Sequence, residues 1–286
     1  MKSFKQRVVV ITGAASGIGR CLAIQLARQG AKLALADMNS QGLAETRALV
    51  DVHCVHCSVH QLDVADRLAV EAFAAEVVQT HGAVHAIFNN AGVTVVDSVE
   101  NQSYEDFSWL MNINFWGVVY CTRAFLPYLK QVDEAHIINI SSVFGLLSMP
   151  MQSAYNSSKF AVRGFTESLK MEMAGSHIQV SCVHPGGIKT SIARNSRMNE
   201  KTLGGTTPEK MTTDFETMAR TTAEQAAAVI LKGVSKNKRR ILVGTDAKIM
   251  SLITRLFPGS YEKIMGIEKG VRKAKAEAAA RGRASI

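Results

Sequence analysis

A tyrosine and a lysine four residues apart are side chains whose types and spacing could do chemistry. Tyr155 and Lys159 lie in the stretch "YNSSK", and on a helix this spacing puts both on one face. A free phenol titrates near pH ~10 and is a poor base at neutral pH. A neighbouring ammonium favours the phenolate, and therefore lowers the pKa of the tyrosine. The pair could take up and return a proton, although such pairs are common on helices and one alone indicates little.

A second candidate is the stretch "VHCVHCSVH", in which Cys54 and Cys57 lie among His53, His56 and His60. Two thiolates share a zinc ion only when both lie about 2.3 Å from it, which a Cys-x-x-Cys pair achieves in a tight turn. No Gly or Pro supplies that turn here, and extended residues three apart point to opposite faces of a strand. We therefore expect no metal site; the cysteines are expected to be small buried apolar residues.

The elements that must position these side chains follow from the alternation of short β-branched runs with longer amphipathic ones. Strands are expected at 7–12, 32–37, 55–64, 84–92, 136–141, 178–187 and 239–244, and helices at 17–30, 40–50, 66–80, 104–131 and 153–174. Such alternation predicts an α/β fold, a Rossmann-type doubly wound parallel sheet of about seven strands with helices on both faces. Ligands bind such sheets beyond the carboxyl ends of the strands.

The 286 residues suit one large α/β domain, which we expect at 1–258, followed by a basic, helical or partly disordered extension at 259–286. No apolar run approaches the ~20 residues that span a bilayer. A glycine interrupts the first apolar stretch after five residues, unlike a signal peptide. We therefore expect a cytoplasmic protein whose five cysteines are reduced.

Glycines follow the first predicted strand in "GAASGIG", at Gly13, Gly17 and Gly19. Gly13 permits a tight turn, Gly17 lets the backbone approach a phosphate, and Gly19 lets the next helix pack against the strand. Free N–H groups at the start of that helix then face an anion. The pattern favours a dinucleotide site over a glycine-rich turn that binds nothing.

Asp37 ends the second predicted strand, near the ~20-residue offset from the glycines at which a carboxylate meets an adenosine ribose. A carboxylate binds the ribose hydroxyls and repels a 2′-phosphate. No basic residue follows Asp37, and Ser16 rather than Lys or Arg precedes Gly17. The sequence therefore predicts NAD as the cofactor, with NADP disfavoured, and Arg20 is the one nearby cation that argues the other way.

Three further stretches complete a pattern with "TGAASGIG" (12–19). They are "NNAG" (89–92) and "ISS" (140–142) at two strand ends, and "YNSSK" (155–159) at the start of a helix. Each motif is weak alone. In this order and at this spacing, they make residues 5–245 resemble the short-chain dehydrogenase/reductase superfamily in its compact single-domain form.

The resemblance implies an oxidoreductase that moves a hydride between a nicotinamide and an alcohol or ketone, with Tyr155 as acid and base. Lys159 would also hold the nicotinamide ribose, Ser142 would hydrogen-bond the substrate oxygen, and Asn114 would hold a water linking the lysine to solvent. The implied cofactor-binding residues are Gly13, Ser16, Gly17, Ile18, Gly19, Asp37, Asp63, Val64, Asn90, Ala91, Gly92, Tyr155, Lys159, Pro185, Gly187, Ile188 and Thr190.

The stretch "VFGLLSMPMQSAY" lies where the resemblance places the wall of the substrate pocket. The implied substrate-binding residues are Ser142, Phe144, Met149, Met151 and Tyr155. No Arg, Lys or His in this stretch could bind a small anion, which favours a hydrophobic secondary alcohol or ketone, such as a steroid, terpenoid, fatty or aromatic carbinol. These residues could instead only pack a helix. Residues 191–221 resemble the family's mobile substrate lid.

The net charge is uneven, because residues 1–188 carry 13 Lys and Arg against 15 Asp and Glu, and residues 189–286 carry 20 against 9. A solvated tail is the simplest interpretation of the basic part; contact with an anionic membrane surface or with an acidic carrier protein are alternatives. No motif indicates nucleic-acid binding. The resemblance implies a homodimer or, first, a homotetramer, assembled through the helices near 104–131 and 153–174.

Two other functions stay open. A 3-oxoacyl-carrier reductase would suit the basic C-terminal third, but most such enzymes use NADPH, which Asp37 disfavours. A non-catalytic NAD-binding regulator would have the same fold. The set of Ser142, Tyr155 and Lys159 argues against a regulator, because a sensor needs no proton donor.

Overall fold

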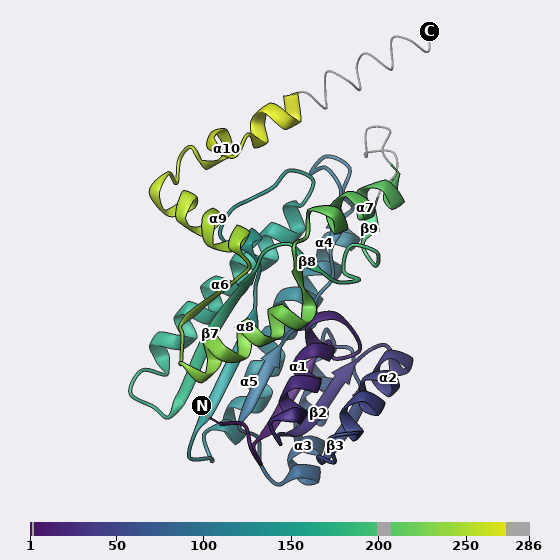
Figure 1. The fold of residues 1–286 in the computed structure, drawn as a ribbon, viewed down its shortest axis with the longest axis vertical. Coiled ribbons are helices and arrows are strands. Elements are labelled where there is room, and N and C mark those ends of the chain that lie inside the picture. Colours follow the sequence, from purple (N-terminus) through teal and green to yellow (C-terminus); the bar gives the residue numbers. More distant parts are fainter. Residues whose placement is uncertain (2, 199–206, 273–286) are drawn as a thin grey trace.

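The computed structural model describes residues 1, 3–198 and 207–272. Its main sheet has seven parallel strands in the order β11-β7-β6-β4-β1-β2-β3 (Figure 1). The strands are β1 (Val8–Thr12), β2 (Lys32–Asp37), β3 (Cys57–Gln61), β4 (Ala86–Asn89), β6 (Ala135–Ile140), β7 (Ile178–Pro185) and β11 (Arg240–Val243). The strand order reverses direction next to β1, as in doubly wound sheets, so the predicted fold class is confirmed.

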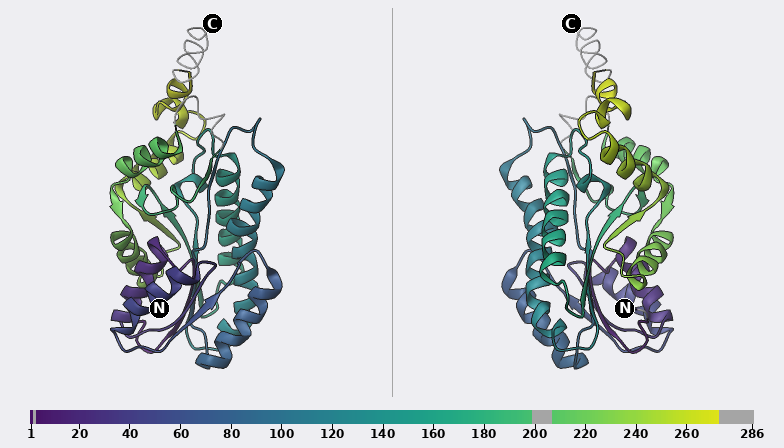
Figure 2. Two further views of the ribbon diagram at one scale, coloured as in Figure 1. Left: turned by 90° about the vertical axis from the view of Figure 1, so that its right-hand side faces the viewer. Right: turned by 90° about the vertical axis from the view of Figure 1, so that its left-hand side faces the viewer.

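Helices cover both faces of the sheet (Figure 2). One face carries α1 (Gly17–Arg28), α2 (Ser40–Asp51) and α8 (Ala223–Ser235), and the other carries α3 (Arg67–His81), α5 (Gly117–Leu129) and α6 (Ser153–Glu172). Side chains of a strand alternate between the two faces. In β1, Val9 packs in the core layer under α1, whereas Val10 packs in the layer under α3 and α5. Both faces are covered, which explains why the strands are continuous apolar runs.

Shorter elements gather at the carboxyl end of the sheet, at the top of Figure 1. They are β5 (Val95–Val96), β8 (Ile188–Lys189), β9 (Arg197–Met198), β10 (Thr221–Thr222), α4 (Tyr104–Met111), α7 (Pro208–Met218), α9 (Thr245–Leu256), α10 (Tyr261–Ile264) and the 3-10 turn η2 (Val143–Gly145). β5 pairs with β9, and β8 pairs with β10. The predicted lid, 191–221, is therefore tied to the body at two points, while its residues 199–206 lie outside the described part.

The helix expected at 104–131 differs from its prediction. It consists of α4, a π-helical turn η1 (Asn112–Trp116) and α5. A π turn fits one extra residue into a helix, and here Asn114 lies in that turn with its amide bound to the main chain of Val93. The prediction of one regular helix is wrong at this point, because a tertiary contact changes the local hydrogen bonding.

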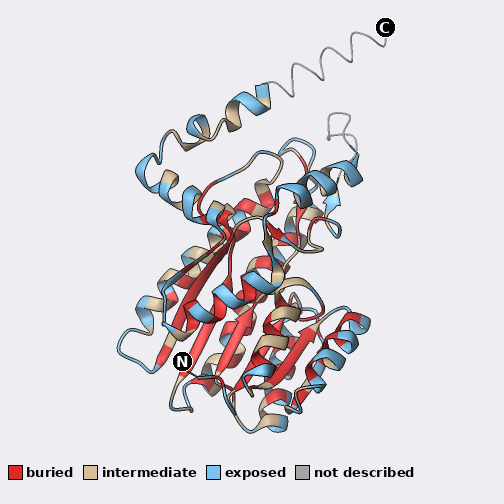
Figure 3. Ribbon diagram, viewed as in Figure 1, coloured by how far each residue is buried: buried red, intermediate tan, exposed pale blue. Residues whose placement is uncertain are grey.

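The sheet and the C-terminal elements differ in how far their residues are buried (Figure 3). The strands β1, β2, β4 and β6 are almost wholly buried, whereas most residues of α9 and α10 are exposed or half-buried. After α10, residues 267–272 are also helical. Within the described residues, no helix combines the length and the apolar composition needed to cross a bilayer.

Candidate active site

The glycine-rich turn after β1 has a conformation and an environment that only glycine accommodates. Gly13 and Gly17 have φ angles of +66° and +53°, which favour glycine. A Cβ at Gly13 would lie 2.8 Å from the Cα of Ala91, and one at Gly19 would lie 2.0 Å from the carbonyl oxygen of Gly13. The start of α1 therefore lies directly on the turn, and a cradle open to a phosphate is formed by backbone alone.

The segment after β4 holds this turn in place. The Asn90 amide donates to the carbonyl oxygens of Thr12 and Gly13, over 3.0 and 3.1 Å. The Thr12 hydroxyl accepts from the backbone N–H groups of Asn90 and Ala91, over 3.0 and 3.1 Å. Thr12 was not predicted as a site residue, although it precedes the glycines. A polar residue at the last position of a strand, beside a glycine-rich turn, was the available signal.

Residues that follow β7 also reach the glycine-rich turn. The Thr190 methyl group lies 3.2 Å from where a Cβ of Gly17 would be, and the hydroxyls of Ser16 and Ser191 are 3.3 Å apart. The structure thus brings the predicted Ser16, Gly17 and Thr190 together. Gly187 is held nearby by a hydrogen bond from its N–H to Asp246, 2.7 Å long, a residue that the sequence analysis did not single out.

Asp37 and Arg20 are the two residues on which the predicted choice between NAD and NADP depends. One carboxylate oxygen of Asp37 accepts from the N–H of Ala15 and the other from the N–H of Asn39, both over 3.0 Å. Asp37 is half-buried at the end of β2, beside the glycine-rich turn. The guanidinium of Arg20 donates to the carbonyl oxygen of Ala15 and forms an ion pair with Glu45 at 2.8 Å.

Arg20 also donates hydrogen bonds to two groups of α2. Its Nε donates to the hydroxyl of Thr46 over 3.0 Å, and an Nη also contacts the carbonyl oxygen of Gly42. Nε and one Nη of Arg20 are thus engaged by protein groups. The glycine cradle and the Asp37 carboxylate lie at the ends of the neighbouring strands β1 and β2.

Two predicted adenine contacts have different environments. Asp63 is exposed and accepts from the N–H of Ala65 over 2.9 Å. Val64 is buried, and a Cβ at Gly117 would lie 2.8 Å from its side chain. The side chain of Val64 is thus part of the packing under α5.

Tyr155, Ser142 and Phe144 meet at the carboxyl end of β6. The Tyr155 hydroxyl is hydrogen-bonded to the side chain of Ser142, and the Ser142 hydroxyl accepts from the N–H of Phe144 over 3.1 Å. The Phe144 ring stands edge-on to that of Tyr155, with centroids 6.1 Å apart. Ser142 begins the turn η2, which fixes the direction of its side chain.

Lys159 lies one turn further along α6, with its side chain buried. Its Nζ donates to the carbonyl oxygen of Ile140 over 3.2 Å and lies 5.5 Å from the centroid of the Tyr155 ring. Burial lowers the pKa of Lys159 to about 8. Burial also raises the pKa of Tyr155 to about 12, against the opposing effect of the hydrogen bond with Ser142. The expected lowering of the tyrosine pKa is therefore absent in the protein alone, because desolvation dominates.

Asn114 is fully buried between the NNAG segment and α6. Its Oδ1 accepts from the N–H of Val93 over 2.8 Å, and its Nδ2 donates to the carbonyl oxygen of Val93 and to Ser158, over 2.9 and 3.2 Å. A Cβ at Gly92 would lie 3.2 Å from Asn114 Oδ1 and 3.4 Å from Lys159 Nζ. The absence of a side chain at position 92 thus lets the amide and the ammonium lie near one another.

His184 is a further residue that sequence reasoning missed. It is fully buried in β7, and its Nδ1 lies 2.9 Å from the carbonyl oxygen of Ser142. Because a carbonyl only accepts, Nδ1 carries the proton. Within the described part of the chain, the buried Nε2 has no hydrogen-bond partner. Burial lowers the pKa of His184 to about 4, so it holds the Ser142 backbone as a neutral ring.

Two predicted substrate residues lie apart from the tyrosine. Met149 and Met151 line a cavity of about 460 Å³ together with Asn156, Ser157 and Phe160. These α6 residues share one face of the helix, and Tyr155 and Lys159 occupy another. Met151 has a φ angle of +64°, which is unusual for a residue other than glycine. The structure thus groups Ser142, Phe144 and Tyr155, and places both methionines in the lining of this cavity.

An apolar cluster beside Tyr155 comes instead from β5, α4 and the start of α6. Its buried members are Val95, Leu110 and Ala154, and Val93, Phe107, Trp109 and Tyr155 pack against them. The guanidinium of Arg197 covers Trp109 at 3.6 Å from the ring centroid and binds Asp106 at 2.7 Å. A strand of two residues and a helix carry no sequence motif, which is why the cluster was not predicted.

The Cys-x-x-Cys stretch lies far from these residues along the chain and at the other edge of the sheet. Cys57 is buried in the edge strand β3, and burial raises its pKa to about 11. Cys54 is exposed in the turn before β3, with a φ angle of +52°. Over residues 1, 3–198 and 207–272, no group of three His, Cys, Asp or Glu side chains is arranged to hold a metal ion.

The sequence and the fold were compared with those of known proteins. The family described as short chain dehydrogenase matches residues 7–201. A Mycobacterium tuberculosis protein named "Putative oxidoreductase SadH" is 44% identical over 276 residues, which cover 96% of this chain and 98% of that protein. A protein of Bacteroides thetaiotaomicron named 3-ketodihydrosphingosine reductase is 34% identical over 197 residues, 68% of this chain and 69% of that protein.

The fold is also that of solved structures. A short-chain dehydrogenase/reductase from Burkholderia phymatum, solved in complex with NAD, superposes with a TM-score of 0.83 at 29% identity, covering 89% of this chain and 95% of that one. The family match spans the glycine cradle, the NNAG segment and the tyrosine and lysine of α6. The chain therefore belongs to the short-chain dehydrogenase/reductase family of oxidoreductases.

Proposed function

We propose that the protein is an NAD-dependent oxidoreductase that interconverts a hydrophobic secondary alcohol and the corresponding ketone. The observation that carries this proposal is the arrangement of Tyr155. Its hydroxyl is bonded to Ser142, its ring contacts an apolar cluster, and Lys159 lies one turn away beside the cradle segment at Gly92. A proton acceptor, an oxygen-binding hydroxyl and an apolar wall thus meet at one point.

The roles of the side chains follow from their bonds. The Ser142 hydroxyl accepts from the N–H of Phe144, so its own proton, which is donated to Tyr155 in the protein alone, is the group that would hold a substrate oxygen. The Tyr155 phenolate takes the proton of an alcohol hydroxyl, and the phenol returns it to a ketone. The ammonium of Lys159 favours the phenolate, and Asn114 keeps the segment around Gly92 in place. A nicotinamide, when bound, supplies the hydride acceptor or donor.

The positive charge of an oxidised nicotinamide is needed for this scheme. In the protein alone, the pKa of Tyr155 is raised to about 12, and that of Lys159 is lowered to about 8. A cation placed near the phenol favours its charged form. We therefore expect an oxidised cofactor, when bound, to favour the phenolate of Tyr155 together with Lys159.

The preference for NAD rests on Asp37 and Arg20. The carboxylate of Asp37 would accept from ribose hydroxyls and repel a 2′-phosphate, and the guanidinium of Arg20 is held by Ala15, Thr46 and Glu45. The Burkholderia phymatum structure that superposes on the fold is an NAD complex, which supports the same cofactor here.

The substrate class rests on the surroundings of Tyr155. Its partners in the cluster are apolar or aromatic, with Val95 and Leu110 buried and Phe107 beside them. The relative named 3-ketodihydrosphingosine reductase supports a ketone on a long apolar chain as one member of the class. For assembly, we propose a homodimer or homotetramer through α5 and α6, where Trp116 and Phe160 are exposed.

The test is a panel of secondary alcohols of increasing hydrophobicity, assayed with NAD and with NADP. We expect kcat/KM with NAD to exceed that with NADP by at least about tenfold. Tyr155→Phe should lower kcat by about 10²- to 10⁴-fold, because the acid and base is removed. It should leave the Kd for NAD, measured by calorimetry, within about threefold of the parent value. Retained turnover in Tyr155→Phe would contradict the assignment, and no turnover of any alcohol by the parent would favour the regulator.

A further inference from the structure

The helix α9 exposes its apolar face, whereas an ordinary surface helix buries that face. Ile249, Leu252 and Leu256 are 54%, 57% and 61% exposed, and their spacing of three and four puts them on one outward face. The inward face carries Ala247, which is fully buried, and polar residues further along. A surface helix normally buries its apolar stripe, so this stripe is unpartnered in the single chain.

Polar surroundings explain why the inward face is not the apolar one. Ser251 and Thr254 line a cavity of about 590 Å³ together with Arg163, Glu167 and Arg240. Glu167 forms ion pairs with both arginines, at 3.2 Å each. Leucine side chains in this cavity would desolvate those charges without replacing their hydrogen bonds. The orientation of α9 is therefore determined by its own sequence and by the surface that it covers.

Cations accompany the apolar stripe, from here on called the α9 stripe (Ile249, Leu252, Leu256). Lys248 and Arg255 are exposed and, seven residues apart, lie together along one edge of it. The exposed Phe257 and Ile264 extend the apolar surface beyond the helix, and Lys263 and Lys269 extend the charge. Of the acidic residues that follow α9, Glu268 is paired with Arg272, and Glu262 lies beside Lys263.

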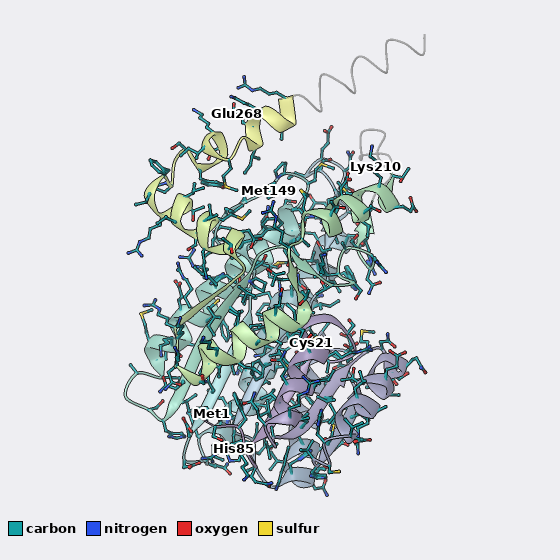
Figure 4. The ribbon with its side chains drawn as sticks, in the orientation of Figure 1. Met1, Cys21, His85, Met149, Lys210 and Glu268 are labelled. Carbon is teal, nitrogen blue, oxygen red and sulfur yellow. The ribbon has the colours of Figure 1, made fainter. Side chains whose placement is uncertain are left out.

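The α9 stripe lies next to the mouth of the proposed site. The helix packs against η2, the turn that begins at Ser142. The hydroxyl of Tyr261 in α10 accepts from the N–H of Ser148 over 3.2 Å, in the stretch that leads from Ser142 to Tyr155. In Figures 1 and 4, α9, α10 and Met149 lie at one end of the molecule, and Met1 and His85 lie towards the other.

We propose that the α9 stripe and its cations form a docking surface for an anionic lipid bilayer, which brings the mouth of the site against the membrane. Apolar side chains would enter the boundary between headgroups and acyl chains, and Lys and Arg would contact the anionic headgroups. A second copy of the chain fits less well. Three to five side chains fall far short of the ~800 Å² per partner of a stable interface, and pairing the same surfaces would bring like charges together.

The docking surface depends on the proposed function in one respect only, because its use would be to supply an apolar substrate from the membrane. Binding to lipid is a property of α9 itself and is measured without turnover. A failure of the proposed function would appear as absence of alcohol oxidation, and a failure of the docking surface would appear as absence of vesicle binding. The two results are independent.

The test is co-sedimentation of the full chain with vesicles of phosphatidylglycerol and phosphatidylcholine in equal parts. The variant Ile249→Ser/Leu252→Ser/Leu256→Ser removes the stripe from exposed positions, so that the fold is not disturbed. We expect its apparent Kd for the vesicles to rise at least about tenfold, because each side chain contributes on the order of 1 kcal/mol on burial. Vesicles of phosphatidylcholine alone should bind the parent at least about tenfold more weakly.

The matched control is Leu49→Ser/Leu68→Ser, which removes leucines that are 45% and 66% exposed on α2 and α3. It should bind vesicles as the parent does, and all three proteins should oxidise a water-soluble alcohol equally. Equal binding by the parent and the stripe variant would overturn the proposal, as would no binding of the parent to anionic vesicles. A parent dimer in lipid-free solution that the stripe variant converts to monomers would assign the stripe to a second copy instead, and would also overturn it.

Discussion

The two halves of the sheet hold their ligands in different ways. On the cofactor side, β1 and β2 are buried apolar strands, and the turn at Gly13 touches Ala91 and Gly19 at distances that leave no room for a side chain. On the substrate side, β6 and β7 contain buried polar residues, and the side chains around Tyr155 come from β5, α4, η2 and the start of α6. The cofactor half is thus determined by one local motif, and the substrate half is assembled from segments that are distant in the sequence.

The largest expected effect tests the rigidity of the cofactor half. Gly19→Ala places a Cβ 2.0 Å from the carbonyl oxygen of Gly13, so that the turn must move. We expect a loss of NAD affinity of more than about 100-fold and a decrease in the free energy of unfolding of about 3 kcal/mol. Calorimetric titration and denaturant unfolding measure the two quantities.

Gly270→Ala is the matched control, because a Cβ at this exposed position of the helical residues 267–272 would meet nothing within 4 Å. Alanine has the higher helix propensity, so this variant should be unchanged or more stable by up to about 1 kcal/mol. If Gly19→Ala bound NAD within tenfold of the parent, the cradle would not be as rigid as its contacts indicate.

A second, smaller effect comes from the buried histidines and depends on pH. Burial lowers the pKa of His136 in β6 to about 3 and that of His184 in β7 to about 4. The unfolded chain takes up a proton near pH 6.5, and the folded chain does not, so protons favour unfolding between these values. The free energy of unfolding should therefore fall as the pH drops from 6.5 towards 4, by up to about 1.4 kcal/mol per pH unit for each histidine.

His81 at the end of α3 also has a lowered pKa, about 4, and contributes to the same slope. The variant His136→Asn isolates one group, since asparagine does not titrate. Below pH 6.5, the slope of its unfolding free energy against pH should be smaller by about 1.4 kcal/mol per pH unit, which is the contribution of one proton. This difference does not depend on the absolute stability of the variant. An unchanged slope would show that His136 is not the neutral, buried group that its surroundings in β6 indicate.

The smallest effect concerns the substrate half alone. Phe107→Ala removes a ring from the apolar cluster beside Tyr155. We expect the KM for a hydrophobic alcohol to rise about tenfold, the equivalent of a partly buried phenyl group, while the KM for NAD stays within about twofold. Tyr104→Ala, at an 88% exposed position of the same helix, serves as the control. An equal rise in both KM values for Phe107→Ala would mean that the halves are not separable.

The cofactor half could be predicted from the sequence because its signals are local. Gly13, Gly17 and Gly19 are needed by a single turn, and Asp37 ends the neighbouring strand, so spacing along the chain reflects spacing in the fold. Thr12 and Asn90 could have been paired by the same logic, since their strands are neighbours in the sheet. The tyrosine and lysine were predicted from the combination of their helical spacing with the other motifs of the resemblance, because the spacing alone indicates little.

The substrate half could not be predicted in the same way. Met149 and Met151 were predicted because the resemblance places the pocket wall in the stretch after Ser142; in the structure they line a cavity with Asn156, Ser157 and Phe160 of α6. Phe107 and Leu110 approach Tyr155 only through tertiary packing. The apolar face of α9 was visible as composition, but its outward direction depends on the charged cavity beneath it.

The π turn at Asn112–Trp116 has a consequence for any variant of different length. A π turn takes up one surplus residue in its wider turn, so that the residues after it keep their orientation. Deleting a single residue within this turn would therefore give a regular helix and leave Cys121 and Phe125 facing the interior. The same deletion within the regular part of α5 would instead rotate every later side chain by about 100° around the axis, and would thereby misalign an entire wall of the protein.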